Sequence, residues 1–170
     1  MPNPDFISVR EASGSDVELM EQSRNLHGAG PADERMGAYF RGLHHPHKAL
    51  LPRTGYIAMA DNKPVGYTAG HLTTRFGYAG ELQYLFVAPP YRRRGIGRRL
   101  VTSLANWFVA QGALRVCVCV DLESEPAAPF MPVSVQDHSA NAGTLGRTLR
   151  LSLANTEAKR GHCRVEKIEK

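Results

Sequence analysis

The spacing of apolar residues changes along the chain and predicts both helices and strands. Apolar positions three or four residues apart predict helices over about residues 17–26, 33–43 and 96–110. Short runs of alternating or continuous apolar residues predict strands at residues 6–10, 56–60, 65–73, 81–87 and 116–120. The order strand-helix-helix-strand-strand-strand-helix-strand is typical of a single α/β or α+β domain.

The pattern weakens beyond about residue 130. Strands are predicted there at residues 131–135, 149–153 and 164–168, and no internal repeat is visible. We therefore divide the chain into a core, residues 1–130, and a divergent C-terminal region, residues 131–170. Whether that region completes the fold stays open at this point.

The composition is that of an ordinary single domain. The 170 residues are 42% hydrophobic and 22% charged, which argues against disordered, collagen-like and coiled-coil chains. Three cysteines are too few for a disulfide framework, and no cysteine–histidine spacing matches a zinc site. No apolar run reaches about 20 residues, and the first residues lack the pattern of a signal peptide. We expect a cytoplasmic protein with no metal and no membrane partner.

The positive charge is concentrated in one segment. The net charge is +5, and five arginines lie within eight residues: Arg92, Arg93, Arg94, Arg98 and Arg99. Without these arginines the chain would have no net charge. The cluster therefore indicates a binding site for a small anion, or a charged surface exposed to solvent. A nucleic-acid-binding module is the last of our hypotheses, because no aromatic residues interleave with the basic ones.

This basic segment joins the strand at 81–87 to the helix at 96–110. Two prolines end the strand, because proline supplies no N–H group to a sheet. Gly95 and Gly97 let the backbone approach a ligand closely, and the first N–H groups of a helix have no partner within it. Together with the helix dipole and the arginines, this arrangement favours a phosphate group. It is not a nucleotide-binding loop, because GxxxxGK[ST] is absent and Leu100 stands where the dinucleotide fingerprint has its third glycine.

The segment resembles the central motif of the GNAT superfamily, the acyl-CoA-dependent N-acyltransferases. Their motif [Q/R]-x-x-G-x-[G/A] is matched by Arg92, Gly95 and Gly97, and the elements around it follow the family's order over residues 6–130. The resemblance implies a mixed, mainly antiparallel sheet flanked by helices. It also implies acetyl-CoA as the acyl donor, with its pyrophosphate held by Arg92, Arg93, Arg94, Gly95, Ile96, Gly97 and Arg98. Arg93 or Arg94 would also meet the cofactor's 3′-phosphate.

The resemblance further implies which groups transfer an acetyl group to a primary amine. An amine of pKa ~10.4 must lose a proton before it attacks the thioester. Glu81 is the first candidate for the base, and His71, with an unperturbed pKa of ~6.5, is the second. The main-chain amides of Phe86 and Val87 would bind the pantetheine arm and polarise the carbonyl. Structural alternatives stay open: an exposed carboxylate at the start of a strand, and core side chains for the others.

The chain departs from the family where a tyrosine usually protonates the leaving thiolate. Phe130 matches the family's pattern, but Met131 stands in the tyrosine's place and cannot donate a proton. Tyr84 and Tyr91 are alternative general acids, but their positions in the sequence do not favour either of them. General acid catalysis contributes roughly 10²–10⁴-fold, so its loss would weaken transfer without abolishing it. A degenerate acyl-CoA-binding protein with little or no turnover is therefore the second hypothesis.

A change of reading frame would explain this departure. With suitable codons for residues 129–135, a reading from the third base gives Phe-Tyr-Ala-Arg-Phe-Gly, which looks like the missing family pattern. We hypothesise that the tail after about residue 129 arose from a frame shift. The alternative is a divergent region that builds its own strands, and the coding DNA decides between them. After a frame shift, the strand at 116–120 would be an exposed sheet edge through which the protein dimerises or aggregates.

Ordinary packing also explains the other residues that invite a functional interpretation. His44, His45 and His47 lack the further ligand of a metal site, so we expect a solvated loop, which the resemblance places beside the acceptor pocket. Core packing is expected for Cys117, Cys119 and Trp107. The acceptor stays open between small-molecule amines and peptide amines, and a homodimer is compatible with the sequence.

Overall fold

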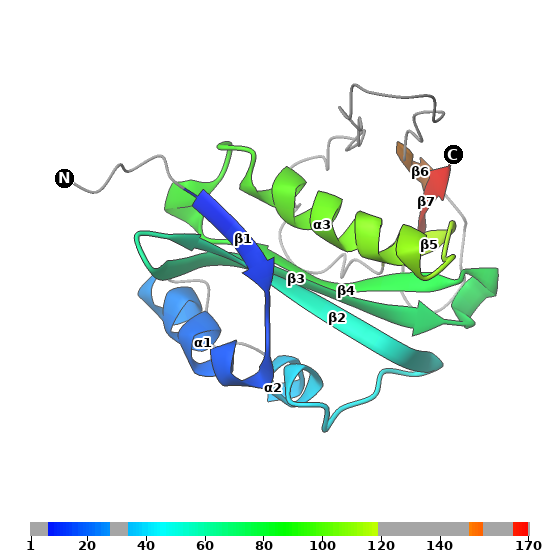
Figure 1. Cartoon of the computed structure of the whole chain (residues 1–170), viewed down its shortest axis with the longest axis horizontal. Helices are drawn as coiled ribbons and strands as arrows, with labels where there is room; N and C mark the ends of the chain where they lie inside the picture. The colour runs from blue at the N-terminus through cyan, green and yellow to red at the C-terminus, as the bar shows by residue number, and fades with distance from the viewer. Residues whose placement is uncertain (1–6, 28–33, 119–149, 155–164, 170) are drawn as a thin grey trace.

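A five-stranded sheet forms the centre of the part of the chain that the structure describes (Figure 1). This computed structural model describes residues 7–27, 34–118, 150–154 and 165–169. The strands lie in the order β1 (Ile7–Glu11), β2 (Ala49–Ala60), β3 (Lys63–Thr73), β4 (Gly80–Val87) and β5 (Val116–Val118). The first four pair antiparallel, whereas β4 and β5 pair parallel. The mixed, mainly antiparallel sheet expected above is confirmed.

Helices cover both faces of this sheet (Figure 1). The described helices are α1 (Val17–Leu26), α2 (Glu34–Phe40) and α3 (Ile96–Ala110). One face carries α3, whose Leu104 and Phe108 pack against Leu82 of β4. The other face carries α1 and α2, whose Met20 and Met36 pack against the sheet around Ile57. The bounds predicted for α1 and α3 are confirmed, and none of these described helices is long and apolar enough to cross a membrane.

The strands predicted at 56–60 and 65–73 form a hairpin, β2 and β3, and its first strand is longer than predicted. Asp61 and Asn62 connect the strands with φ angles of 48° and 61°, as a two-residue hairpin turn requires. The prediction began the strand at residue 56, but β2 begins at Ala49. A register shift between Leu50 and Arg53 takes up extra residues and lets this irregular segment pair with β3. Pairing with β3, rather than an alternating pattern, makes it a strand.

The second helix ends earlier than the predicted residue 43. Gly42 has a φ of +78°, and its N–H donates to the Tyr39 carbonyl at 3.0 Å. The Leu43 N–H donates to the Ala38 carbonyl at 2.8 Å. This pair of bonds is the Schellman motif, in which a left-handed glycine closes the last turn of a helix. The helix therefore stops at Phe40.

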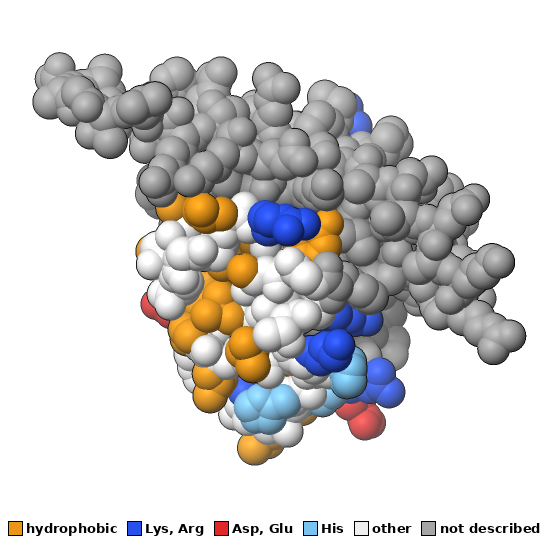
Figure 2. Space-filling view, turned by 90° about the vertical axis from the view of Figure 1, so that its right-hand side faces the viewer, with side chains coloured by type: hydrophobic (Ala, Val, Ile, Leu, Met, Phe, Trp, Pro, Cys, Tyr) orange, Lys and Arg blue, Asp and Glu red, His pale blue; other side chains and the backbone are white. Residues whose placement is uncertain are grey.

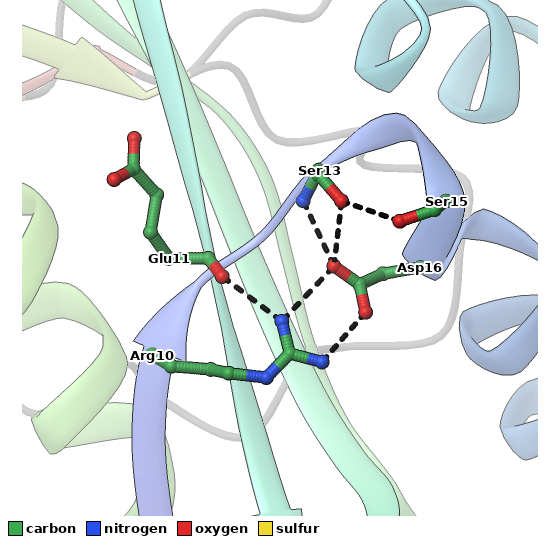
Figure 3. Close-up of polar contacts among 5 residues, drawn as sticks. All are labelled: Arg10, Glu11, Ser13, Ser15 and Asp16. Atoms are coloured by element: carbon green, nitrogen blue, oxygen red, sulfur yellow. Dashed lines mark hydrogen bonds and ion pairs between the residues drawn. The ribbon is translucent and has the colours of Figure 1, made fainter.

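A charged contact fixes the connection between β1 and α1 (Figure 3). Arg10 donates two hydrogen bonds to the Asp16 carboxylate, at 2.6 and 3.0 Å. The Ser13 N–H donates to the same carboxylate at 2.9 Å. These donors stabilise the charged form and lower the pKa of Asp16 to about 2. The contact ties the edge strand to the helix that follows it.

Two short strands are described in the C-terminal region. β6 (Arg150–Ala154) and β7 (Val165–Glu169) pair antiparallel as a separate two-stranded sheet. They confirm, to within one residue, the strands predicted at 149–153 and 164–168. The strand predicted at 131–135, the end of the one predicted at 116–120, Met131 and Cys119 lie outside the described residues.

Candidate active site

The loop between β4 and α3 turns sharply before the helix begins. A short 3₁₀ turn (Pro89–Tyr91) follows β4, and two left-handed residues come next, Arg93 with a φ of 64° and Gly95 with a φ of 78°. α3 begins directly afterwards at Ile96. Backbone N–H groups that alternate between right- and left-handed residues form concave sites for anions. The left-handed residues Arg93 and Gly95 are compatible with the anion-binding loop that the sequence predicts, and the binding of an anion stays a prediction.

The N–H groups of this loop have no acceptor in the described part of the chain. Gly95 is the N-cap of α3 and has no side chain to accept a hydrogen bond. The first N–H bonded across the cap is that of Arg99, which donates to the Gly95 carbonyl at 3.1 Å. Among the described residues, none of the hydrogen bonds uses an N–H of residues 93–98 as its donor. A ligand with several oxygen acceptors fits these donors.

Two glycines leave the space in front of this loop empty. A Cβ atom on Gly95 would meet no atom within 4 Å, and one on Gly97 would meet only Val87 Cγ2, at 3.8 Å. Packing within the protein therefore does not explain why residue 97 is a glycine. Glycine in a helix even costs about 1 kcal/mol of stability relative to alanine. The missing side chain keeps the helix backbone accessible to a ligand.

The arginines around the loop are exposed. Arg92 Nε donates to the Val87 carbonyl at 2.9 Å, which holds its guanidinium at the end of β4. Arg94 lies over the Tyr91 ring, 5.7 Å from its centroid. None of the described salt bridges involves an arginine of residues 92–99. Their charge is available to a phosphate.

The described pairs between β4 and β5 cover only the start of β4, Gly80 to Leu82. A register shift also separates the pairs that β3 makes with Leu82 and Tyr84. From Gln83 onward, β4 has described partners only in β3. That an extended ligand lies along this part of β4 stays a prediction.

The register of β3 and β4 distinguishes the amides of Phe86 and Val87. The Ala88 N–H donates to the Val65 carbonyl at 2.9 Å, and successive residues of an antiparallel strand alternate in direction. The Phe86 amide therefore faces β3 and the Val87 amide faces away from it. The Val87 carbonyl points outward as well, because it accepts from Arg92. Both amides stay predictions as ligand donors, and the geometry favours Val87.

Glu81, the predicted base, lies in a buried polar cluster. Its side chain is not the exposed carboxylate that was the structural alternative, because the residue is 0% exposed. Arg75 Nη1 donates to Glu81 Oε1 at 2.9 Å, and His71 Nε2 lies 3.6 Å from Glu81 Oε2. The structure thus brings the two predicted bases, Glu81 and His71, into contact. Both side chains lie on the face of the sheet that α1 and α2 cover.

Sequence reasoning missed Tyr39 as a member of this cluster. The Tyr39 hydroxyl lies 3.1 Å from His71 Nδ1. Nδ1 accepts from the Tyr39 hydroxyl in the tautomer that carries its proton on Nε2. Among the described residues, neither His71 Nε2 nor Glu81 Oε2 has a hydrogen-bond partner. Burial raises the pKa of Tyr39, which keeps it a donor. Its spacing with Met36 and Phe40 indicated only a core position.

The other residues considered in the sequence, the loop histidines and Cys117, have ordinary structural surroundings. Arg53 donates to the carbonyls of Tyr39 and His44 and contacts the His45 ring, so it braces the connection between α2 and β2. Figure 2 views this end of the molecule, where histidine and hydrophobic side chains lie among lysines and arginines. Burial raises the pKa of the Cys117 thiol to about 12. Among the described residues, no three His, Cys, Asp or Glu side chains gather as a metal site requires.

The sequence and this loop agree on a family. A model of the acetyltransferase (GNAT) family matches residues 20–131, about two thirds of the chain, and spans β4, the anion-binding loop and α3. The chain belongs to the GNAT acetyltransferase family. The resemblance carried by Arg92, Gly95 and Gly97 is thereby confirmed. No curated protein matches the sequence.

Solved GNAT structures share the fold of this GNAT chain. PaiA N-acetyltransferase from Thermoplasma acidophilum, in complex with coenzyme A, has a TM-score of 0.57 at 17% identity, with 97% of this chain and 99% of that chain covered. Aminoglycoside N-acetyltransferase AAC(6′)-Iy, in complex with CoA, has a TM-score of 0.52 at 21% identity, with coverages of 72% and 82%. An acetyltransferase from Thermus thermophilus has a TM-score of 0.54 at 16% identity, with coverages of 85% and 94%. At these identities the likeness concerns the fold.

Proposed function

We propose that this GNAT chain moves an acetyl group from acetyl-CoA to a primary amine by direct transfer in a ternary complex. The observation that supports this most strongly is the row of N–H groups at residues 93–98, which have no described acceptor and lie among exposed arginines. A diphosphate carries the charge and the oxygen acceptors that such a site binds.

On the cofactor side, the proposal uses the loop and the part of β4 that follows its described pairs with β5. The N–H groups of residues 93–98 bind the pyrophosphate beside the Arg92 guanidinium, and Arg93 or Arg94 meets the 3′-phosphate. The Arg92 N–H itself donates to the Pro89 carbonyl. The pantetheine arm extends along β4, where its register leaves main-chain groups facing away from β3. The Val87 amide donates to this arm, whereas the Phe86 amide, the other predicted donor, faces β3.

On the acceptor side, Glu81 takes the proton that the ammonium must lose before it attacks. About six residues separate Glu81 from Val87, or roughly 20 Å along an extended strand. The base therefore lies at the far end of β4 from the phosphates, and the thioester lies between them. A small-molecule amine is the acceptor that we infer first, since related folds include aminoglycoside N-acetyltransferases. A peptide amine fits the same chemistry.

One observation favours the second candidate, an acyl-CoA-binding protein with little turnover. Glu81 is fully buried and already bonded to Arg75, so a bound amine does not reach it in this arrangement. Measuring CoA release with a panel of amines separates the candidates. Tight cofactor binding without CoA release would favour the binding protein.

Calorimetry with acetyl-CoA tests the cofactor site. The double variant Arg93→Glu, Arg94→Glu should bind at least about tenfold more weakly, because charge-assisted hydrogen bonds to phosphate are replaced by repulsion. The matched control is Arg41→Glu, Lys48→Glu, which changes the net charge equally near the opposite end of β2 and β3. The control should bind as the wild-type chain does. Equal affinities for all three proteins would refute the phosphate-binding loop.

A further inference from the structure

The Glu81 carboxylate is closed to solvent, so the proposed base requires a route of access. Glu81 is 0% exposed, and His71 and Tyr39 are each 1% exposed. These two side chains cover the Oε2 side of the carboxylate. An acceptor amine cannot approach from that side without unpacking α2.

Arg75 is the partner of Glu81 that extends to the surface. Its side chain is 29% exposed, and its Nη1 donates to Glu81 Oε1 at 2.9 Å. The Arg75 backbone is held in place, because its N–H donates to Thr73 Oγ1 at 3.1 Å and its carbonyl accepts from the Tyr78 N–H at 3.0 Å. A displacement of the guanidinium from Glu81 would therefore move the Arg75 side chain and not its backbone. Arg75 is the partly exposed partner of the carboxylate, and it bonds to Oε1.

Besides Arg75, the groups that face the Glu81 carboxylate are His71 on β3, with Tyr39 of α2 behind it, and Cys117 on β5, whose pKa Glu81 helps to raise. Arg75 supplies the guanidinium that pairs with this buried carboxylate at Oε1. Removal of Arg75 would leave the carboxylate without that cation unless another cation replaced it.

We propose that Arg75 is an exchangeable counter-ion, which the ammonium group of the acceptor displaces from Glu81 Oε1. The inference rests on the proposed function, because it describes how the acceptor reaches the base. One cation replaces another, so the buried carboxylate stays paired throughout the exchange. The site thereby selects a protonated amine, since a neutral group has no means of replacing a guanidinium.

The exchange also accounts for the protons of the transfer. The ammonium at Oε1 gives one proton to Glu81, and the neutral amine attacks the thioester carbon. The C–S bond breaks, the thiolate takes the second proton from the former ammonium, and the products are an amide and the CoA thiol. The amide carries no positive charge, so Arg75 returns to Oε1. The first proton passes from Glu81 to water.

His71 and Tyr39 act as positioning residues in this scheme. The Tyr39 hydroxyl lies 3.1 Å from His71 Nδ1, and His71 Nε2 lies 3.6 Å from Glu81 Oε2. His71 therefore packs beside Oε2, whereas Oε1 bonds to Arg75. The exchange therefore takes place at one oxygen atom.

Binding of a simple ammonium ion tests the exchange without turnover. In Arg75→Met, methylammonium chloride should raise the thermal unfolding midpoint more than tetramethylammonium chloride at equal concentration, because only the former has N–H donors. We expect methylammonium to bind at least about fivefold more tightly than to the wild-type chain, where it competes with Arg75. The double variant Arg75→Met, Glu81→Gln is the control and should show no preference between the two ions.

The outcomes separate this inference from the proposed function. Equal effects of the two ions on Arg75→Met, or the same preference in the double variant, would overturn the exchange. If Arg75→Met does not fold, Arg75→Lys takes its place. The exchange would equally be overturned if Arg75→Lys preferred methylammonium over tetramethylammonium no more than the wild-type chain does. Acetyl transfer by the wild-type chain is measured separately. Methylammonium binding without transfer to any amine would refute the proposed function and leave the cation site standing.

Discussion

Gly97 tests the anion-binding loop directly, because Gly97→Ala should change stability and cofactor binding in opposite directions. The new methyl group would lie 3.8 Å from Val87 Cγ2, which is an ordinary contact, so it fits the protein without ligand. Replacing glycine by alanine in a helix stabilises it by about 0.5–1 kcal/mol. Gly97 is in the first turn of α3, so we expect the lower value, a rise of about 1–2 °C in the unfolding midpoint.

The same methyl group would occupy the space in which we place the pyrophosphate. Moving the diphosphate away from the helix lengthens its bonds to the N–H groups. A charge-assisted hydrogen bond contributes about 1.5–3 kcal/mol, so the loss of one corresponds to roughly 10–100-fold weaker binding. Calorimetry with acetyl-CoA measures the affinity, and thermal unfolding without ligand measures the stability.

Gly95→Ala is the matched control for backbone strain. It adds the same methyl group in free space, but at a φ of 78°, where a side chain costs about 1–2 kcal/mol. This variant should therefore be less stable than the wild-type chain. If Gly97→Ala binds acetyl-CoA as tightly as wild type does, the helix backbone does not approach the cofactor and the proposed loop is wrong.

Two further predictions concern carboxylates. Glu81→Gln should lower kcat by roughly 10²–10⁴-fold and leave acetyl-CoA affinity unchanged, as measured by CoA release and calorimetry; unchanged kcat would exclude Glu81 as the base. Asp16→Asn should lose about 1–2 kcal/mol of unfolding free energy at pH 7, an amount reduced because half of the Arg10 side chain is exposed. The Asp16 pKa is depressed on folding from 3.8 to about 2, so this stabilisation is complete above about pH 4 and disappears as the pH falls through 2. Urea unfolding of both proteins should therefore show a difference that vanishes at low pH, and a constant difference would contradict the assignment.

The buried cluster changes how the candidate base is understood. Glu81 is fully buried and bonded to Arg75, whose side chain is partly exposed. If Glu81 is the base, as we propose, the acceptor has to compete with Arg75. Under this proposal, the competition links selection of an ammonium group to access to the base.

Several elements could be read directly from the sequence, because their causes are local. The apolar stripe of residues 96–110 determines the helix and its buried face, and Asp61 and Asn62 determine a two-residue hairpin turn. The end of α2 at Phe40 was also available, since Gly42 lies inside the predicted helix and a glycine near the end of a helix signals a left-handed cap. The first half of β2 was not, because pairing with β3 rather than its own pattern makes it a strand.

By itself, the sequence determined a basic, glycine-containing connection between a strand and a helix, from which we predict the anion-binding loop. Its charge and its glycines are local properties, present wherever the domain places the segment. Only the tertiary structure decided the surroundings of the base. Tyr39, His71, Arg75 and Glu81 come from α2, β3, a 3₁₀ turn and β4, and their contacts depend on strand register and on how α2 packs over the sheet. No local spacing encodes that packing, because it arises from the burial of side chains that are distant in sequence.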